Sequence, residues 1–275
     1  VNGAPQRAYI PKEEAASPTV ANESVFITST IAAAERRFVR CFDVPGAFLH
    51  TDSDENVLMI LRGDLAEMMV QIAPEIYRKY VAVDKKGTPV LYVRLQKALY
   101  GLLRSSLLFY RKLRKELEEY GFEVNPHDPC VANKTIETVV SVPTLNKDGS
   151  KVRNTKGQCV MKDEVRTKQL TVIWHVDDLM VSCEDNFEIT KFACYLAGIY
   201  GPKLAMHTGP KHDYLGMDLE FTPDRKLEVS MFGYVDGIIR DFPEDISGKA
   251  ASPAADHLFK IREEEHDKYL SEEEA

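Results

Sequence analysis

The sequence shows few of the patterns that mark secreted, zinc-binding or membrane-spanning proteins. Its five cysteines are an odd number without a CxxC pair, which argues against a disulfide framework and against a zinc knuckle. The seven histidines show no HExxH spacing. No apolar run approaches the ~20 residues that cross a bilayer, and the first residues lack the layout of a signal peptide. We therefore expect an intracellular chain with no membrane partner, and the missing initiator Met indicates a piece of a longer polypeptide.

Charge is distributed unevenly along the chain, whose net charge is −8. Residues 261–275 hold seven acidic and two basic side chains, whereas residues 78–115 hold eleven Lys and Arg against the single Asp84. A basic field of that size can bind a polyanion whatever the charge of the whole chain. For the cations of residues 111–115 taken alone, a solvated helix face is the favoured interpretation.

Helices and strands are expected to alternate without regular βαβ units, which favours an α+β domain over a doubly wound sheet. Apolar periodicity and capping residues predict helices over 23–38, 64–80, 105–120, 185–200 and 234–241, with caps at Asn22, Ser105 and Ser106. Strands are predicted over 39–43 with a continuation over 47–49, and over 57–61, 90–95, 170–175, 178–182, 214–221 and 227–231. Residues 139–168 are expected to form a polar surface insertion, in the shape of an extended hairpin.

Two adjacent acids lie where one of these hairpins is expected to bend. The segment LTVIWHVDDLMVS (residues 170–182) places Asp177 and Asp178 between two apolar runs, whereas tight hairpin turns favour Asn-Gly or Asp-Gly. Asp43 likewise ends an apolar strand, just before a Pro-Gly bend. If the three carboxylates share one sheet, their repulsion requires either a proton or cations between them, and oxygen ligands favour Mg²⁺ or Mn²⁺. Two such ions would suit in-line phosphoryl transfer.

Each acid also has a simpler explanation. A lone Asp at a strand end is more often a turn former or a helix cap than a metal ligand, and this applies to Asp43 by itself. The pair Asp177 and Asp178 is harder to explain in this way, because Asp is disfavoured in strands. Spacing along the chain does not show that the two places meet.

Five ordered motifs resemble those of one family of polymerases. They are FDVPGAFLH (42–50), LQKALYGLLRSSLLFYRKL (95–113), DPC (128–130), WHVDDLMVS (174–182) and HDYLGMDLEF (212–221). Their order and spacing are similar to those of the reverse transcriptases of copia-type (Ty1/copia) LTR retrotransposons. The later SPAADHLF (252–259) resembles the segment that follows the polymerase core in algal members of that group. The resemblance covers nearly the whole chain, from about residue 9 to residue 259.

The resemblance implies an RNA-directed DNA polymerase shaped like a right hand. Such an enzyme has a palm built on an antiparallel sheet with flanking helices, and fingers inserted into it. On this basis residues 1–21 are an N-terminal arm and residues 22–255 form the fingers and palm, with the start of a thumb or connection after about residue 232. Residues 256–275 are an acidic and mobile tail.

By the same resemblance, Asp43, Asp177 and Asp178 are the catalytic carboxylates. They would hold two Mg²⁺ (or Mn²⁺) ions together with the backbone carbonyl of Val44. The primer 3′-hydroxyl would then attack the α-phosphate of the incoming deoxynucleotide, with pyrophosphate as the leaving group. Phe48 stands where the family has an aromatic gate against the ribose 2′-hydroxyl, which is the group that separates the two sugars. Plain core packing is the alternative for this ring.

Further contacts follow from the same motifs. Gly46 and Ala47 are expected to bind the nucleotide, because their small size lets the backbone approach the triphosphate. The expected contacts with template and primer are Lys97, Tyr100, Gly101, Arg104, Tyr214, Leu215 and Gly216. For the last three residues core packing is an equally good explanation.

Several features depart from the family. His175 stands where the commonest form of the hairpin has Tyr, and residues 101–107 lack the Lys, Gln and Pro of the family's GLKQAPR. The cationic N-terminal strand of the fingers is missing, and Arg7 is the only basic residue before Lys12. These differences put some template and triphosphate contacts in question.

The implied partners are a primed RNA or DNA template and deoxynucleoside triphosphates. The protease, integrase and RNase H domains of a Pol polyprotein, which serve processing and DNA integration, are further implied partners outside this chain. The implied location is the cytoplasm, in a virus-like particle, or the nucleus. Two other classes of function stay open: a decayed or truncated remnant that binds nucleic acid without polymerising, and a structural domain with no nucleic-acid role.

Overall fold

The computed structural model describes residues 3–54 and 56–243. The chain divides into two units, Val1–Met231 and Phe232–Ala275. In the described part, the first unit contains three antiparallel sheets with helices around them, and the second contains helix α7 (Phe232–Asp241). This mixture confirms the predicted α+β class at the level of antiparallel sheets with helices. The predicted acidic tail, residues 256–275, lies outside the described residues. Among the described helices, none is long and apolar enough to cross a membrane.

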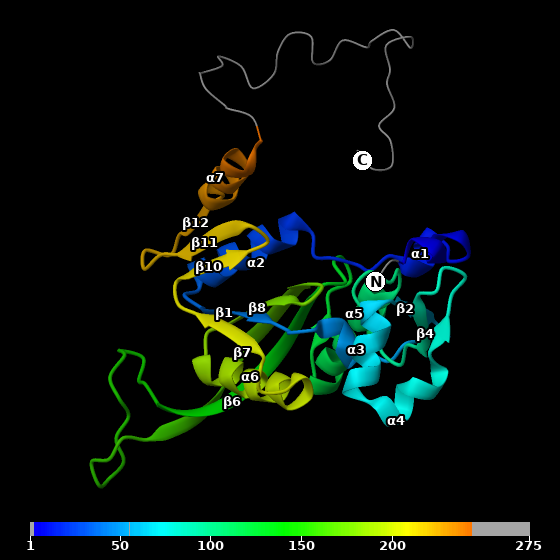
Figure 1. Ribbon diagram of the computed structural model, residues 1–275. Helices are drawn as coiled ribbons and strands as arrows, with labels where there is room; N and C mark the ends of the chain where they lie inside the picture. The colour runs from blue at the N-terminus through cyan, green and yellow to red at the C-terminus, as the bar shows by residue number, and fades with distance from the viewer. Residues whose placement is uncertain (1–2, 55, 244–275) are drawn as a thin grey trace, which may run out of the picture. The chain divides into compact units, whose positions relative to one another are not determined.

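A central sheet of six strands carries the core of the first unit (Figure 1). Its strands, in spatial order, are β5 (Glu123–Val124), β6 (Val131–Pro143), β7 (Met161–His175), β8 (Asp178–Cys183), β1 (Phe38–Asp43) and β9 (Ala205–Thr208). All neighbours run antiparallel. Strand β8 is buried from Leu179 onward, as a continuous apolar run in the middle of a covered sheet should be.

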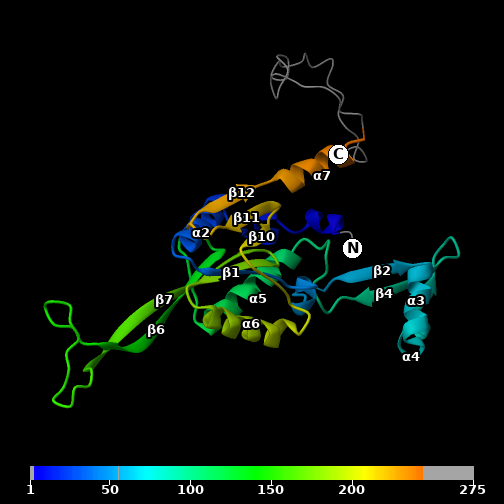
Figure 2. The ribbon, with the colours of Figure 1, turned by 90° about the vertical axis from the view of Figure 1, so that its left-hand side faces the viewer.

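Helices cover one face of this sheet, and a helix with a small sheet covers the other (Figure 2). On the first face lie α5 (Ser105–Tyr120) and α6 (Asn186–Tyr200), and Tyr110 of α5 stacks on Trp174 of β7 with ring centroids 6.2 Å apart. The other face carries α2 (Asn22–Ala34) and a three-stranded sheet of β10 (Lys211–Tyr214), β11 (Met217–Phe221) and β12 (Leu227–Ser230). The catalytic candidates therefore lie on a sheet that is packed on both faces.

A third sheet is inserted between β1 and α5 along the chain. It consists of β2 (Leu58–Arg62), β4 (Pro89–Arg94) and β3 (Ala82–Val83), joined by α3 (Asp64–Ile72), α4 (Pro74–Tyr77) and a 3-10 helix (Arg78–Tyr80). Strand β2 alternates between exposed and half-buried residues, which is the pattern of a small, one-sided sheet. Pro74 ends the helical run at Ile72 and starts α4, as a proline inside a helical pattern does.

The N-terminal segment, predicted to be an aperiodic arm, forms a 3-10 helix (Ala4–Ala8) and the one-turn helix α1 (Lys12–Ala15). Gln6 and Ile10 are buried. The Gln6 side-chain oxygen accepts a hydrogen bond from the backbone N–H of Leu103 at 3.0 Å. A buried amide with a partner holds this segment against the loop before α5, which a composition-based prediction does not detect.

Several local predictions were wrong. The predicted caps at Asn22 and Ser106 lie inside their helices, since α2 is capped by Ala21 and α5 by Arg104. The helix predicted over 23–38 ends at Ala34, because Arg36 takes a left-handed conformation (φ 57°) that closes the helix. Residues 47–49 do not continue the strand of Asp43, since Gly46 turns the chain with φ 64° into a 3-10 helix (Ala47–His50). Ser105 does not cap α5; its hydroxyl donates to the carbonyl oxygen of Leu99 at 2.6 Å.

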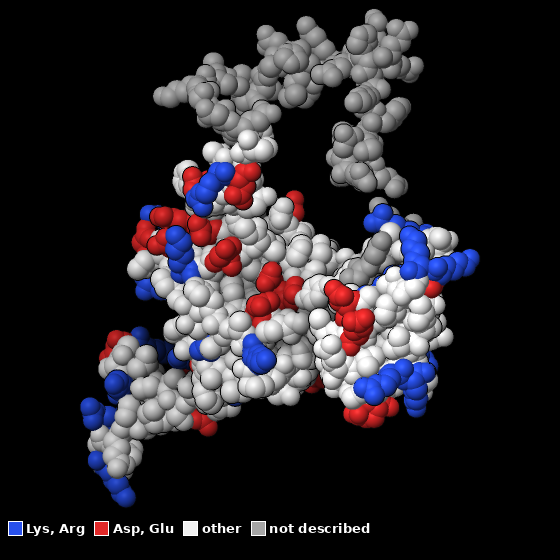
Figure 3. Space-filling model, viewed as in Figure 1, with Lys and Arg blue, Asp and Glu red and all other residues white. Residues whose placement is uncertain are grey.

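The insertion predicted over 139–168 is an extended hairpin, as expected. β6 and β7 continue past the rest of the central sheet, and their outer parts, 134–143 and 161–170, pair with each other alone among the described strands. Figure 2 shows this two-stranded arm extending from the first unit, and Figure 3 shows Lys and Arg side chains along it.

Candidate active site

The end of β1 and the hairpin between β7 and β8 lie side by side in the central sheet. The strand register pairs Asp43 with Asp178, and the backbone N–H of Val44 donates to the carbonyl oxygen of Asp177 at 3.3 Å. Side chains directly opposite each other on antiparallel strands have Cβ atoms ~5 Å apart. The structure thus brings Asp43 beside the pair Asp177 and Asp178, which is far from it in the sequence. Figure 3 shows acidic side chains gathered over this part of the sheet.

The sequence suggested that the hairpin bends at the two acids, Asp177 and Asp178, but the turn lies one residue earlier. His175 pairs with Asp178, so that the two-residue turn consists of Val176 and Asp177, and Asp178 already belongs to β8. Val176 has φ 57°, a left-handed conformation that is unfavourable for a β-branched residue. Strain of this kind persists only where the surrounding structure enforces it, and here the strand residues on both sides of the turn, 170–174 and 179–183, are buried.

Repulsion between the carboxylates affects the pKa of Asp178. Burial raises the pKa of this carboxyl above its ordinary value, and the charges of Asp177 and Asp43 raise it further. His175 acts in the opposite direction and Asp213, on β10, in the same direction as the other acids. Since a negative charge is disfavoured at Asp178 by negative neighbours, a cation placed among these groups would be stabilised by all of them.

Asp177 has a partner from a different part of the chain. The Tyr100 hydroxyl donates to Oδ2 of Asp177 at 3.2 Å. The Tyr100 ring lies against Phe48, with ring centroids 4.3 Å apart. Burial and the Asp177 charge raise the pKa of Tyr100, so that its proton stays on the hydroxyl as the donor of this bond. The aromatic pair of Phe48 and Tyr100 thus forms one wall beside the carboxylates.

The donor set of this cluster fits a divalent cation better than it fits zinc. Asp43, Asp177 and Asp178 offer only oxygen, which Mg²⁺ and Mn²⁺ prefer. Among the described residues, however, no group of three or more His, Cys, Asp and Glu side chains is already arranged to hold a metal ion. The Tyr100 hydroxyl uses one lone pair of Asp177 Oδ2, and this carboxylate keeps further lone pairs for an ion.

The nucleotide-binding candidates lie directly after Asp43. Gly46 has φ 64°, so the position requires a residue that tolerates the left-handed region. Ala47 is fully buried and Phe48 is 8% exposed. The Phe48 ring packs on Tyr100 and, edge-on, on Phe109 at 6.3 Å between centroids. Both interpretations of this ring, as core packing and as a gate beside the site, are compatible with that position.

In the 95–113 motif, the two cationic candidates for template contacts form ion pairs with acidic side chains. Lys97 forms an ion pair with Asp52 at 2.7 Å, and Arg104 forms one with Asp54 at 2.8 Å. Gly101 has φ 91°, and its carbonyl oxygen would lie 2.2 Å from a Cβ placed on Gly3. The loop of this motif therefore needs the N-terminal segment close against it.

The basic field of residues 78–115 is weaker in the structure than in the sequence. Besides the two pairs just described, three of its cations lie one helical turn before a glutamate of α5. They are Lys112, Arg114 and Lys115, paired with Glu116, Glu118 and Glu119. For these three the solvated helix face, favoured from the sequence, agrees with their pairing.

The primer candidates lie on the hairpin between β10 and β11. Leu215 (φ 55°) and Gly216 (φ 73°) form its turn. Tyr214 is 3% exposed, and its hydroxyl donates to the backbone carbonyl oxygen of Asp178 at 3.4 Å. A buried ring cannot contact a primer directly, so Tyr214 supports the hairpin against β8. Leu215 and Gly216 remain candidates for a contact.

A pocket of about 250 Å³ opens between this hairpin and the carboxylates. Its walls include Asp43, Asp178, His207 and Asp213. Cys41 lies two residues before Asp43, on the same face of β1. Burial and the charges of Asp178 and Asp213 raise the pKa of its thiol to about 12, so the thiol stays protonated. Asp213 was missed as a site residue in the sequence; its place in the HDYLG motif was the signal that could have indicated it.

A scan against models of protein families finds no match. The chain is 24% identical over 259 residues to a retrovirus-related Pol polyprotein from transposon TNT 1-94 of Nicotiana tabacum. The match covers 94% of this chain and 16% of the polyprotein.

Among solved structures the chain matches telomerase from Candida tropicalis. In its truncated apo form the TM-score is 0.37 at 11% identity, covering 77% of this chain and 40% of telomerase. In complex with the TWJ fragment of telomeric RNA the TM-score is 0.38 at 11% identity, covering 84% and 36%. TM-scores of this size do not establish a shared fold. The match to the polyprotein by itself shows a chain similar along most of its length to part of a retrotransposon Pol polyprotein.

Proposed function

We propose that this chain is the reverse-transcriptase region of a copia-type retrotransposon Pol polyprotein, an RNA-directed DNA polymerase that extends a primer 3′-hydroxyl. The observation that carries the proposal is the register of the central sheet, which places Asp43 opposite Asp178 with Asp177 beside them. The similarity to the TNT 1-94 polyprotein over 94% of the chain supports the same assignment.

On this proposal the central sheet is the palm, and the sheet of β2, β3 and β4 with α3 and α4 belongs to the fingers. Asp43, Asp177 and Asp178, with the Val44 carbonyl, would hold two Mg²⁺ or Mn²⁺ ions. Such ions lower the pKa of the attacking hydroxyl and stabilise the charge of the leaving group.

The aromatic pair beside the carboxylates has two separate tasks in this proposal. Tyr100 orients Asp177 through its hydroxyl, and its ring supports Phe48. Phe48 would exclude a ribose 2′-hydroxyl from the nucleotide site. Replacing Phe48 with Val opens space for that hydroxyl, so incorporation of ribonucleotides should rise relative to deoxynucleotides in a primer-extension assay.

The experiment that tests the activity is extension of a DNA primer on an RNA template by the purified protein with Mg²⁺ or Mn²⁺. Asp178→Asn replaces a negatively charged metal ligand with a neutral amide. Because the ions are then held less firmly and stabilise the transition state less, the extension rate should fall by ~10²–10⁴-fold. The matched control is Glu137→Gln, which removes one exposed carboxylate from the β6 arm. Equal extension by the wild type and Asp178→Asn would contradict the assignment.

A remnant that binds nucleic acid without polymerising is the second candidate. It is favoured by the ion pairs of Lys97 with Asp52 and of Arg104 with Asp54, which occupy two expected template contacts. This candidate predicts salt-dependent binding to a primed template and no extension at any Mg²⁺ or Mn²⁺ concentration.

A further inference from the structure

A cationic pocket lies at the end of β1 that is remote from the carboxylates. Its volume is about 760 Å³, and it lies where α2 ends and β1 begins. Three of its lining residues are Arg36, Arg37 and Arg40, and among the residues that the structure describes none that lines the pocket is acidic. Because a strand rises ~3.4 Å per residue, Arg40, the lining residue of β1 nearest to Asp43 in sequence, is ~10 Å from it. This pocket shares no lining residue with the pocket beside the carboxylates, so the two are separate.

The three arginines differ in how far their charge is already compensated. Arg37 is held in the wall, since its guanidinium contacts Glu35 at 2.7 Å and the Thr171 hydroxyl at 3.0 Å. Arg40 donates to neutral acceptors, Oδ1 of Asn186 at 2.6 Å and Oγ1 of Thr190 at 3.0 Å. Within the described part of the chain, its positive charge is therefore oriented by these contacts without a carboxylate that neutralises it.

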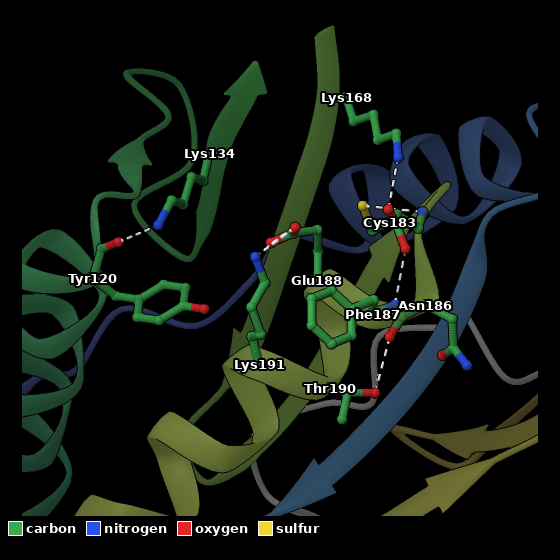
Figure 4. A network of polar contacts seen from close by, with 10 residues as sticks. Tyr120, Lys134, Lys168, Cys183, Asn186, Phe187, Glu188, Thr190 and Lys191 are labelled. Carbon is green, nitrogen blue, oxygen red and sulfur yellow. Dashed lines mark hydrogen bonds and ion pairs between the residues drawn. The ribbon is translucent and has the colours of Figure 1, made fainter. Parts of the chain in front are cut away.

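The start of α6 supplies these neutral acceptors and adds no free acid to the pocket. Figure 4 shows Asn186 and Thr190 on the first turns of the helix, together with Lys168. Lys168 forms an ion pair with Asp185, the cap of α6, at 2.6 Å. The acid nearest to Asn186 in sequence is thus already paired.

Arg36 is the exposed member of the set. In the part of the chain that the structure describes, its side chain has no hydrogen bond or ion pair, while its backbone N–H donates to the carbonyl oxygen of Ala33 at 3.1 Å. The backbone N–H of Arg37 donates to the carbonyl oxygen of Ala32 at 2.8 Å. This is the Schellman end of α2, in which the left-handed residue is usually Gly. The cap would be better formed without a side chain at residue 36, so the arginine is not there for the cap.

An aromatic surface accompanies the charges. Phe38 lines the same pocket and is 50% exposed. Cationic side chains beside an exposed ring form the combination that binds single-stranded nucleic acid, in which the phosphate meets the cations and the base stacks on the ring.

We propose that this pocket is a second contact for nucleic acid. It takes one nucleotide of a single strand, with the phosphate between Arg36 and Arg40 and the base against Phe38. This inference goes beyond the proposed function, and it holds whether or not the carboxylate site polymerises.

The test is the binding of a fluorescently labelled single-stranded oligodeoxythymidylate, measured by anisotropy in chelator over a series of salt concentrations. Arg36→Gly should lower the affinity about fivefold and reduce the slope of log K against log salt by about 0.7, the value for one phosphate of a single strand. Its melting temperature should rise by about 2–4 °C, since Gly suits the left-handed position. Phe38→Ala should lower the affinity about tenfold without changing the salt slope.

The matched control is Arg225→Gly. Arg225 also has a left-handed backbone (φ 69°) but does not line the pocket. It should gain stability in the same way and bind like the wild type. The proposal is overturned if Arg36→Gly and Arg225→Gly bind equally well. It is also overturned if inorganic phosphate displaces the oligonucleotide at equal phosphate concentration, because the pocket would then be a site for a small anion only. Primer extension by Arg36→Gly, measured separately, keeps this result distinct from failure of the polymerase proposal.

Discussion

Removing one carboxylate from the cluster of Asp43, Asp177 and Asp178 should stabilise the metal-free protein. With carboxylates ~5 Å apart and an effective dielectric constant between ~20 and ~80, each pair repels by about 1–3 kcal/mol. Because Asp178 is only partly buried, the lower end of this range applies. Asp178→Asn should therefore raise the free energy of unfolding by about 1–2 kcal/mol, and the melting temperature by about 2–6 °C.

The pH dependence gives a second measure of the same repulsion. The folded protein holds the pKa of Asp178 above its ordinary value of 3.8. At a pH between this ordinary value and the raised pKa, the folded state therefore binds more protons than the unfolded state. This contribution to stability is complete below about pH 4 and is lost as the pH rises through the raised pKa. Melting in chelator should show this loss for the wild type and a smaller loss for Asp178→Asn.

Addition of Mn²⁺ or Mg²⁺ should stabilise the wild type more than Asp178→Asn. Binding to the folded state alone stabilises it by mass action, so the wild type should gain more than Asp178→Asn. Glu137→Gln is again the control, and its melting temperature should follow the wild type under every condition. The reasoning is refuted if Asp178→Asn is no more stable than wild type at neutral pH in chelator, or if the metal stabilises both equally.

Two further predictions concern the loop before α5. A Cβ on Gly3 would lie 2.2 Å from the carbonyl oxygen of Gly101, so Gly3→Ala should cost about 1–3 kcal/mol in chemical denaturation. Gly198→Ala, inside α6 with no atom within 4 Å of its Cβ, should instead stabilise by about 0.5–1 kcal/mol, and the same sign for both would contradict this reasoning. Tyr100→Phe keeps the ring but removes the hydrogen bond to Asp177; primer extension should fall about tenfold at an unchanged melting temperature, whereas an unchanged rate would exclude a positioning role.

Most of the elements could be predicted from local patterns. Short apolar runs indicated β1, β7 and β8, and the helical spacing of apolar residues indicated α5. The predictions failed where a tertiary contact outweighs a local preference. Ser105 was predicted as a cap because of its residue type, but its hydroxyl contacts Leu99, and the predicted arm is held by the buried Gln6.

The charges show the same limit. Counting Lys and Arg over residues 78–115 predicted a strong basic field, yet Lys97 and Arg104 lie against Asp52 and Asp54. A sum along the chain cannot include acids that only the fold brings near. In contrast, Arg36, Arg37 and Arg40 are close in sequence and line one pocket. They do so because the left-handed conformation of Arg36 ends α2 just before β1 begins.

The sequence by itself determined the residue types of the candidate site and the strands and turns on which they stand, because these depend on neighbours within a few positions. It also carried the ordered motifs that resemble a copia-type reverse transcriptase. Only the tertiary structure decided that Asp43 lies opposite Asp178 and that Tyr100 binds Asp177. These contacts depend on which strands pair and in what register, and that choice is made by burial of the whole core rather than by any one segment.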